Sequence, residues 1–298
     1  MKDYMDLKKL DVVKNRKGFI AALDQSGGST PKALKDYGID SDQYNGEEEM
    51  FDLVHKMRTR ILTSPSFTSK HILGAILFYK TMESKVDGKY TSNYLWDEKN
   101  IVSFLKVDKG LADEENNVKV MKDIPDLEEQ LSVARERGVF GTKMRSVILG
   151  ANREGIEEVV KQQFEFAKVI CDNGLVPIIE PEVDINIPDK EEAETILKEV
   201  VIEQLNKWNK DDLIMFKFTI PTKDNLYLDL YDYECVVRIV ALSGGYTTDK
   251  ACELLKKNDK MIASFSRALA QNIYAYQTEE EFNKVLLESI EQIYDASI

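Results

Sequence analysis

The sequence predicts an α/β fold, a (β/α)8 TIM barrel, from three observations. Eight short apolar runs recur along the 298 residues, as strands buried on both faces do. Charged amphipathic segments lie between most of these runs, and alternating strands and helices form a parallel sheet with right-handed crossovers. Eight strands in a chain of this length favour a closed barrel over an open, doubly wound sheet. The expected strands are 18–24, 72–78, 101–107, 140–148, 175–181, 213–220, 236–243 and 262–267.

Two of the intervening segments carry a clear helical pattern. Segment 154–173 has no glycine after Gly155 and has apolar residues at helical spacing. Gly174 follows it and predicts the end of that helix. Segment 189–208 has a similar apolar stripe. The long connection 81–100 contains Asp87-Gly88, which predicts either a hairpin turn or an excursion at the mouth of the barrel.

Composition and charge disfavour several classes of partner. The net charge of −13 disfavours nucleic acid and anionic membrane surfaces. No apolar run approaches the roughly 18 residues of a membrane helix, and residues 1–18 lack the apolar core of a signal peptide. The cysteines have no CxxC spacing, which fits reduced cytosolic thiols. We therefore expect a cytoplasmic protein with one domain over residues 1–298, and the sequence leaves open whether it forms a homo-oligomer.

The histidines and cysteines do not indicate a metal site. The chain contains only two histidines, His55 and His71, whereas a catalytic zinc site usually takes two or three at defined spacing. We interpret both as structural or surface residues. Cys171 falls beside the apolar stripe of a predicted helix, where a buried structural thiol is expected. No metal and no cofactor are predicted.

The sixth expected strand, 213–220, holds a lysine among large apolar residues. Side chains alternate between the two faces of a strand, so Phe216 and Phe218 fall on a wholly apolar face, and Met215 and Lys217 on the other. An ammonium flanked by apolar residues is costly to bury as a cation. Lys217 is therefore a candidate amine nucleophile.

Polar residues gather where the expected strands end, which is where the active site of a barrel lies. Each has an ordinary structural interpretation when taken alone, because strand lysines usually snorkel, neighbouring carboxylates usually form salt bridges and Ser-Gly-Gly is usually a turn. Their convergence favours compensated charges around a cavity. Glycine-rich backbone after the seventh strand, together with Arg267, suits a phosphate site. The candidates are Asp24, Ser29, Lys106, Lys143, Arg145, Glu180, Glu182, Lys217, Ser243, Gly244, Ser266 and Arg267.

Seven motifs at these strand ends resemble those of class I fructose-bisphosphate aldolases, of the bacterial subgroup that is shorter than the animal enzymes. The motifs are AALDQSGGS (21–29), FLKVDKG (104–110), GTKMRS (141–146), IIEPEV (178–183), MFKFTIP (215–221), VALSGGY (240–246) and SFSRALA (264–270). The chain departs from the animal pattern at Gln25 and Gly27, where that pattern has a glutamate and a threonine, and at Ser266, where it has a glycine. Tyr294 is not the last residue, so it is not assigned the role of the terminal tyrosine of the animal enzymes.

The resemblance implies a lyase that uses a lysine Schiff base and no metal. It would cleave fructose 1,6-bisphosphate reversibly to dihydroxyacetone phosphate and glyceraldehyde 3-phosphate in glycolysis and gluconeogenesis. Lys217 would form the imine, Glu180 would shuttle the proton that expels water, and Asp24 would be the base for carbon–carbon cleavage. Lys143 would favour the neutral form of Lys217 and steady developing charge. Glu182 would orient Lys217 or its neighbours.

The resemblance also implies two binding ends for a bisphosphate. One phosphate would be held by Ser243, Gly244, Ser266 and Arg267. The other end of the substrate would meet Lys106, Arg145 and Ser29, although Lys106 could instead only neutralise Asp24.

Three other functions compete with this interpretation. An imine-forming aldolase for tagatose 1,6-bisphosphate or another phosphosugar would share the barrel and the lysine. A metal-dependent aldolase is disfavoured by the shortage of histidines. A non-catalytic phosphosugar-binding barrel would leave no covalent adduct with substrate.

Overall fold

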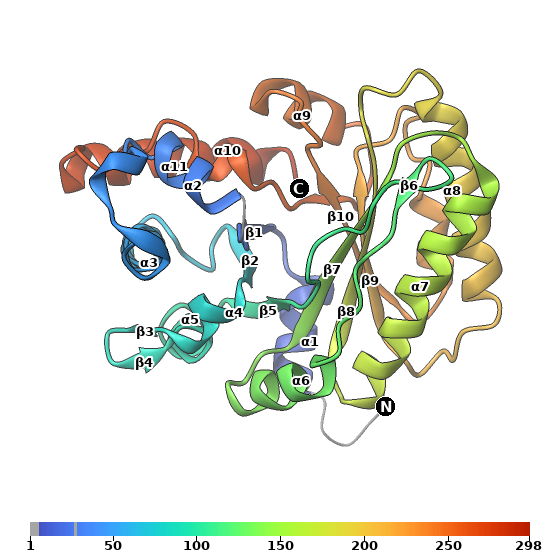
Figure 1. Cartoon of the computed structure of the whole chain (residues 1–298), viewed down its shortest axis with the longest axis horizontal. Coiled ribbons are helices and arrows are strands. Elements are labelled where there is room, and N and C mark those ends of the chain that lie inside the picture. The colour runs from blue at the N-terminus through green and yellow to red at the C-terminus, as the bar shows by residue number, and fades with distance from the viewer. Residues whose placement is uncertain (1–5, 27–28) are drawn as a thin grey trace.

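The computed structural model describes residues 6–26 and 29–298, without the side chain of Arg267, and shows a nearly closed barrel of eight parallel strands (Figure 1). The strands follow one another in space in their chain order, and a short strand β6 (Val118–Lys119) pairs antiparallel with β7. The predicted barrel is thus confirmed. Its strands are β1 (Phe19–Leu23), β2 (Ile72–Leu77), β5 (Val102–Lys106), β7 (Gly141–Ile148), β8 (Val176–Val183), β9 (Ile214–Thr219), β10 (Val236–Leu242) and β11 (Ile262–Ala263).

Helices cover the outside of the barrel, with α7 and α8 on one side and α2, α3, α10 and α11 on the other (Figure 1). The two predicted helices are present as α7 and α8. Gly174 ends α7 as expected, since it has a φ of 80° and Leu175 N donates to Ile170 O at 3.2 Å. The α-helices are α1 (Leu7–Asn15), α2 (Thr30–Asp36), α3 (Gly46–Thr63), α4 (Tyr79–Glu83), α5 (Thr91–Lys99), α6 (Leu127–Glu136), α7 (Arg153–Asp172), α8 (Lys190–Leu205), α9 (Thr248–Leu255), α10 (Arg267–Ala270) and α11 (Glu279–Asp295). Two 3-10 helices, η2 (Ser41–Gln43) and η3 (Leu228–Asp232), complete the elements.

The connection after β2 contains a hairpin, one of the two alternatives that the sequence predicted. Strands β3 (Lys85–Val86) and β4 (Lys89–Tyr90) pair antiparallel around Asp87 and Gly88. Both turn residues have positive φ, 48° and 81°, as a type I′ turn requires.

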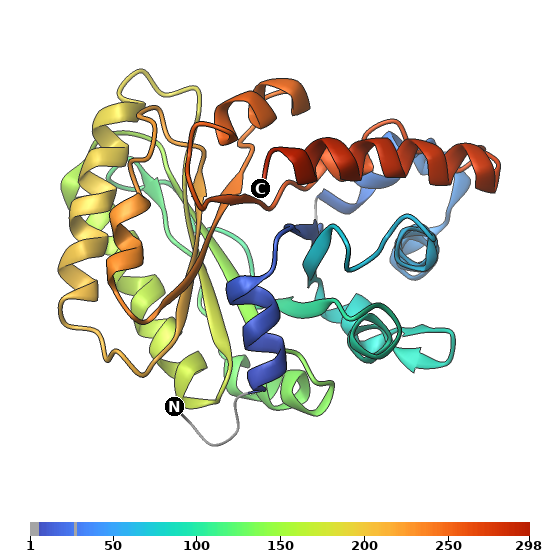
Figure 2. The ribbon, with the colours of Figure 1, turned by 180° about the vertical axis from the view of Figure 1, so that it is seen from behind.

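Strand alternation divides the apolar residues into an outer and an inner core. On β9, Phe216 and Phe218 pack in the outer core under the helices, while Met215 belongs to the core inside the barrel, as the sequence predicts. Helix α1 adds Val12 and Val13 to the inner core and lies against the barrel strands (Figure 2). Arg238 of β10 fastens the end of this helix, because its Nε donates to Val13 O at 2.9 Å. Helix α1 therefore closes the end of the barrel at which the inner core lies.

The eighth strand is shorter than expected, and this corrects one prediction. The sequence predicted 262–267, but β11 contains only Ile262 and Ala263, and Arg267 begins α10. The strand pairs with β10 alone, and no ladder joins it to β1 in the part of the chain that the structure describes. A strand with one pairing edge and few ladder bonds is weakly held. Ser264 N still donates to Ala241 O at 2.8 Å before the chain turns away.

The thiols and imidazoles lie in structural positions. Cys171 and the other two cysteines are buried, and none of the three forms a disulfide. His71 is buried and packs edge-on against Tyr294, and His55 is half-buried on α3 with its Nε2 3.0 Å from Lys85 O. Over residues 6–26 and 29–298, no helix has the length and apolar character needed to cross a membrane.

Candidate active site

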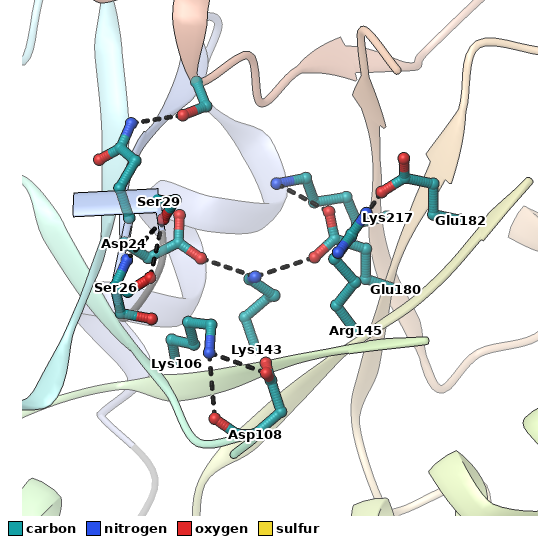
Figure 3. Close-up of polar contacts among 12 residues, drawn as sticks. Asp24, Ser26, Ser29, Lys106, Asp108, Lys143, Arg145, Glu180, Glu182 and Lys217 are labelled. Atoms are coloured by element: carbon teal, nitrogen blue, oxygen red, sulfur yellow. Dashed lines mark hydrogen bonds and ion pairs between the residues drawn. The ribbon is translucent and has the colours of Figure 1, made fainter. Parts of the chain in front are cut away.

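Four buried charged side chains, from β7, β8, β9 and the residue after β1, form a continuous chain of ion pairs (Figure 3). Lys143 of β7 lies at its centre, with its Nζ 2.6 Å from Asp24 Oδ2 and 3.0 Å from Glu180 Oε2. The other carboxylate oxygen of Glu180 lies 3.1 Å from Lys217 Nζ. None of the four residues is more than 9% exposed. The structure thus brings together the four residues that the sequence predicted to be catalytic.

The register of the strands explains why these four side chains meet. Side chains two residues apart on a strand share a face, so Glu180 stands directly above Ile178, and Lys217 above Met215. Ile178 and Met215 are opposite each other in the β8–β9 ladder and belong to the inner core. The charged layer therefore rests on the apolar interior of the barrel, on its carboxyl side.

The backbone pairing between β8 and β9 stops just below Glu180. Only Ile178 and Ile179 pair with β9 along the described ladder, and Pro181 has no N–H to contribute. Thr219 then joins the strands again through its side chain, accepting from Val183 N at 3.0 Å and donating to Val183 O at 2.7 Å. Glu180 and Lys217 consequently lie just beyond the last paired residues of this ladder.

Mutual attraction keeps Asp24 and Lys143 charged despite their burial. Burial alone would raise the pKa of the Asp24 carboxyl, but the Lys143 and Lys217 ammonium groups hold that pKa well below its ordinary value. Burial would likewise lower the pKa of Lys143, and Asp24 and Glu180 outweigh this and raise it well above its ordinary value. At neutral pH, Asp24 is therefore a carboxylate and Lys143 an ammonium.

Lys217 has unused hydrogen-bonding capacity. An ammonium can donate three hydrogen bonds. Among the described residues, Glu180 is its only polar partner within hydrogen-bond or ion-pair distance. Two donor directions of a buried amine are thus left for a ligand.

Two further ion pairs line the rim of the charged layer. Lys106 Nζ lies 2.7 Å from Asp108 Oδ1, and Arg145 Nε lies 2.6 Å from Glu182 Oε2. Glu182 was expected to orient Lys217 or its neighbours, and its observed partner is Arg145. Lys106 pairs with Asp108, not directly with Asp24. The rim cations are less buried than the central lysines.

The expected phosphate residues occupy two neighbouring loops. Ser243 begins a turn in which Tyr246 N donates to Ser243 O at 3.0 Å. Gly244 has a φ of 60°, and a Cβ there would lie 2.8 Å from Ile185 Cγ2, so the turn requires glycine. Ser266 directly precedes α10. The side chain of Arg267 lies outside the described part of the structure.

Ser29, expected at the other end of the substrate, bonds within its own loop. Its hydroxyl donates to Ser26 O at 2.8 Å and accepts from Ser26 N at 3.0 Å. Gly27 and Gly28 of the same motif lie outside the described residues.

Three residues that sequence reasoning did not assign also belong to the site. Besides Asp108, these are Gln25, whose side chain donates to Ser266 Oγ, and Arg58, which donates to Gln25 O at 2.5 Å. Arg58 is buried on the apolar face of α3 beside Ile61, so its helical position could have revealed it. Gln25 and Ser266, both departures from the animal pattern, contact each other.

Comparisons with known proteins bear on the family and on the fold. A family model described as "Glycolytic: Fructose-bisphosphate aldolase class-I" matches residues 7–226. A solved structure of fructose-bisphosphate aldolase from Plasmodium falciparum, in complex with TRAP and a small-molecule inhibitor, is 22% identical with a TM-score of 0.77, covering 98% of this chain and 93% of that one. A Corynebacterium glutamicum protein is 11% identical with a TM-score of 0.53, at 98% and 92% coverage. The two structural likenesses support the barrel fold.

Proposed function

The chain belongs to the class I fructose-bisphosphate aldolase family and is therefore a lyase, and we propose that it cleaves fructose 1,6-bisphosphate through a Schiff base on Lys217. The products would be dihydroxyacetone phosphate and glyceraldehyde 3-phosphate, formed reversibly in glycolysis and gluconeogenesis. The observation that carries the proposal is a buried lysine on a barrel strand, with one carboxylate partner and two open donor directions, just above the apolar inner core.

Imine formation uses Lys217 and Glu180. Lys217 first gives one proton to the Glu180 carboxylate, and its neutral Nζ then attacks the ketose carbonyl carbon. The resulting carbinolamine loses its hydroxyl as water to give an iminium. Glu180, 3.1 Å from the nitrogen, then passes the proton it took from Lys217 to the departing hydroxyl. Lys143, 3.0 Å from the other oxygen of Glu180, would hold that carboxyl group in place.

Carbon–carbon cleavage uses Asp24. The carboxylate removes the proton of the hydroxyl on the carbon that becomes the aldehyde, and the electrons of the broken bond move to the iminium to give an enamine. The low pKa of Asp24 keeps it ionised but makes it a weak base while Lys143 is bound to it. We expect the substrate to take over part of the hydrogen bonding of Lys143 and so strengthen the base.

The two ends of the substrate would be held on opposite sides of this chain of ion pairs. Ser243, Gly244, Ser266 and Arg267 would bind one phosphate through hydroxyl, backbone and guanidinium donors. Lys106, Arg145 and Ser29 would meet the other end. Because Ser29 bonds within its own loop, it would have to exchange that bond for the substrate.

Borohydride trapping tests the central claim. Reduction in the presence of dihydroxyacetone phosphate should place a stable adduct on the peptide that contains Lys217, as mass spectrometry would show. An adduct on Lys143 or Lys106 with Lys217 unmodified would overturn the assignment. A panel of fructose and tagatose bisphosphates, assayed with and without chelator, separates the proposed substrate from its epimer and from metal-dependent chemistry.

A further inference from the structure

The barrel has a seam between β1 and β11, and one side-chain bond crosses it at the mouth. These strands are the two ends of the sheet, and no ladder joins them within residues 6–26 and 29–298. Gln25, two residues after β1, donates from Nε2 to Ser266 Oγ at 2.5 Å, three residues after β11. This bond therefore links the segment of Asp24 to the loop proposed to hold phosphate.

Arg58 fixes the backbone from which Gln25 reaches across the seam. Its Nη2 donates to Gln25 O and its Nη1 to Thr81 Oγ1, each at 2.5 Å. The side chain is buried, and no carboxylate lies within ion-pair distance of it in the described structure. Burial lowers its pKa to about 10, so it remains a cation at neutral pH. The Arg58 guanidinium, which forms no salt bridge within the described residues, thus holds the backbone carbonyl of Gln25, the residue after Asp24.

The direction of the Gln25–Ser266 bond decides what the serine can do. The amide N–H donates, so the serine oxygen accepts and its own proton remains available. No acceptor for that proton is found among the described residues. We propose that Gln25 is a positioning residue that determines anion affinity, because it leaves the Ser266 hydroxyl as a donor for the substrate phosphate. The inference rests on the proposed function for the identity of the phosphate ester.

A carboxylate at position 25 would reverse this arrangement. It would accept the serine proton and add a negative charge beside the anion, whereas an apolar side chain of similar length would only remove the bond. Gln25→Glu and Gln25→Met therefore separate a polarity effect from a loss of packing. Gln271→Glu is the matched control, because it adds the same charge at an exposed residue just after α10 and can still accept from Thr248.

The first experiment measures the dihydroxyacetone phosphate concentration that gives half-maximal trapping on Lys217. Gln25→Met should raise it about 5-fold and Gln25→Glu at least about 30-fold, while Gln271→Glu stays within about 2-fold. The adduct at saturating ligand should be equal in all variants, because the imine chemistry is untouched. Unchanged half-saturation in Gln25→Glu would overturn the proposal.

A double-mutant cycle with Ser266→Ala tests whether Gln25 acts through the serine. In the Ser266→Ala background, Gln25→Met should add less than about 2-fold, since the group it orients is gone. A full additional effect would show a separate structural role. Calorimetric binding of inorganic phosphate to the same variants is independent of the imine. Phosphate binding should weaken in the same order of variants whether or not an adduct forms. If the wild-type protein forms no adduct but phosphate binding still follows this order, the proposed function is refuted and the role of Gln25 stands.

Discussion

Two of the buried lysine–glutamate pairs in the described structure differ in how completely the protein satisfies the hydrogen bonding of the lysine. Lys190 and Glu194 lie on α8, outside the barrel, and are 8% and 0% exposed. Lys190 Nζ donates to Glu194, to Ile220 O at 3.0 Å and to Thr222 Oγ1 at 3.0 Å. The second oxygen of Glu194 accepts from Thr222 N at 2.9 Å. All three ammonium protons are used, so this pair is closed to any ligand.

Lys217 and Glu180 are equally buried, at 4% and 3% exposed, yet the lysine has only one partner among the described residues. The comparison shows that burial of an ion pair is not enough by itself to identify a reactive site. What distinguishes the barrel pair is unfilled hydrogen-bonding capacity beside a second lysine. Four experiments can break or sharpen this comparison.

The largest effect is expected from Lys217→Met. Turnover should fall at least about 10⁴-fold and no adduct should be trapped, because the imine nitrogen is gone. The free energy of unfolding should change by less than about 1 kcal/mol, since Glu180 keeps Lys143 as partner. Lys190→Met is the matched control and should retain trapping. A stability loss in Lys217→Met as large as in that control would remove the distinction between the pairs.

Asp24→Asn and Glu180→Gln should affect different steps. With Asp24→Asn the imine should form and accumulate, while turnover falls roughly 10²–10⁴-fold for want of a base. With Glu180→Gln the formation of the adduct should itself be slow. Single-turnover trapping resolves the two rates. If Asp24→Asn gives no adduct while Glu180→Gln traps at the wild-type rate, the assigned roles are wrong.

Lys190→Met should destabilise the fold by about 3–5 kcal/mol, because it leaves Glu194 buried without a counter-ion. The turnover number of the protein that remains folded should be unchanged. The double variant Lys190→Met/Glu194→Leu should recover most of the lost stability, as replacing both members of a buried pair usually does. Urea denaturation measures the stability lost in the single variant and the stability recovered in the double variant. A Lys190→Met protein of wild-type stability would contradict the interpretation that this pair is fully satisfied within the fold.

The smallest effect concerns acid stability. The pKa of Asp24 is lowered in the folded state, so its contribution to stability is present above its ordinary pKa of about 3.9 and is lost as pH falls through the folded value. The destabilisation caused by Asp24→Asn should therefore be greater at pH 6 than at pH 3. Denaturation midpoints of wild type and variant give this difference, with Asp113→Asn, at an exposed position, as the control. An equal difference at both pH values would mean that Asp24 is not paired in the folded state.

Much of the fold followed from the sequence because strand alternation is a local property. The apolar face of β9, the glycine that ends α7 and the turn at Asp87-Gly88 each depend on a few consecutive residues. The length of β11 was missed because a strand persists only where a neighbour pairs with it. That neighbour is far away in sequence, and on one side of β11 it does not pair.

The sequence by itself determined which residues point into the barrel mouth, because a period of two fixes the face of every strand residue. Only the tertiary structure decided which partner each charge takes. Lys143 bridges Asp24 and Glu180, Glu182 pairs with Arg145, and Gln25 reaches Ser266. These choices depend on register between strands, on the gap between β8 and β9 and on the seam, which long-range packing sets. Residue type and order cannot specify such distances, because the attraction between two charges depends on where the whole fold places them.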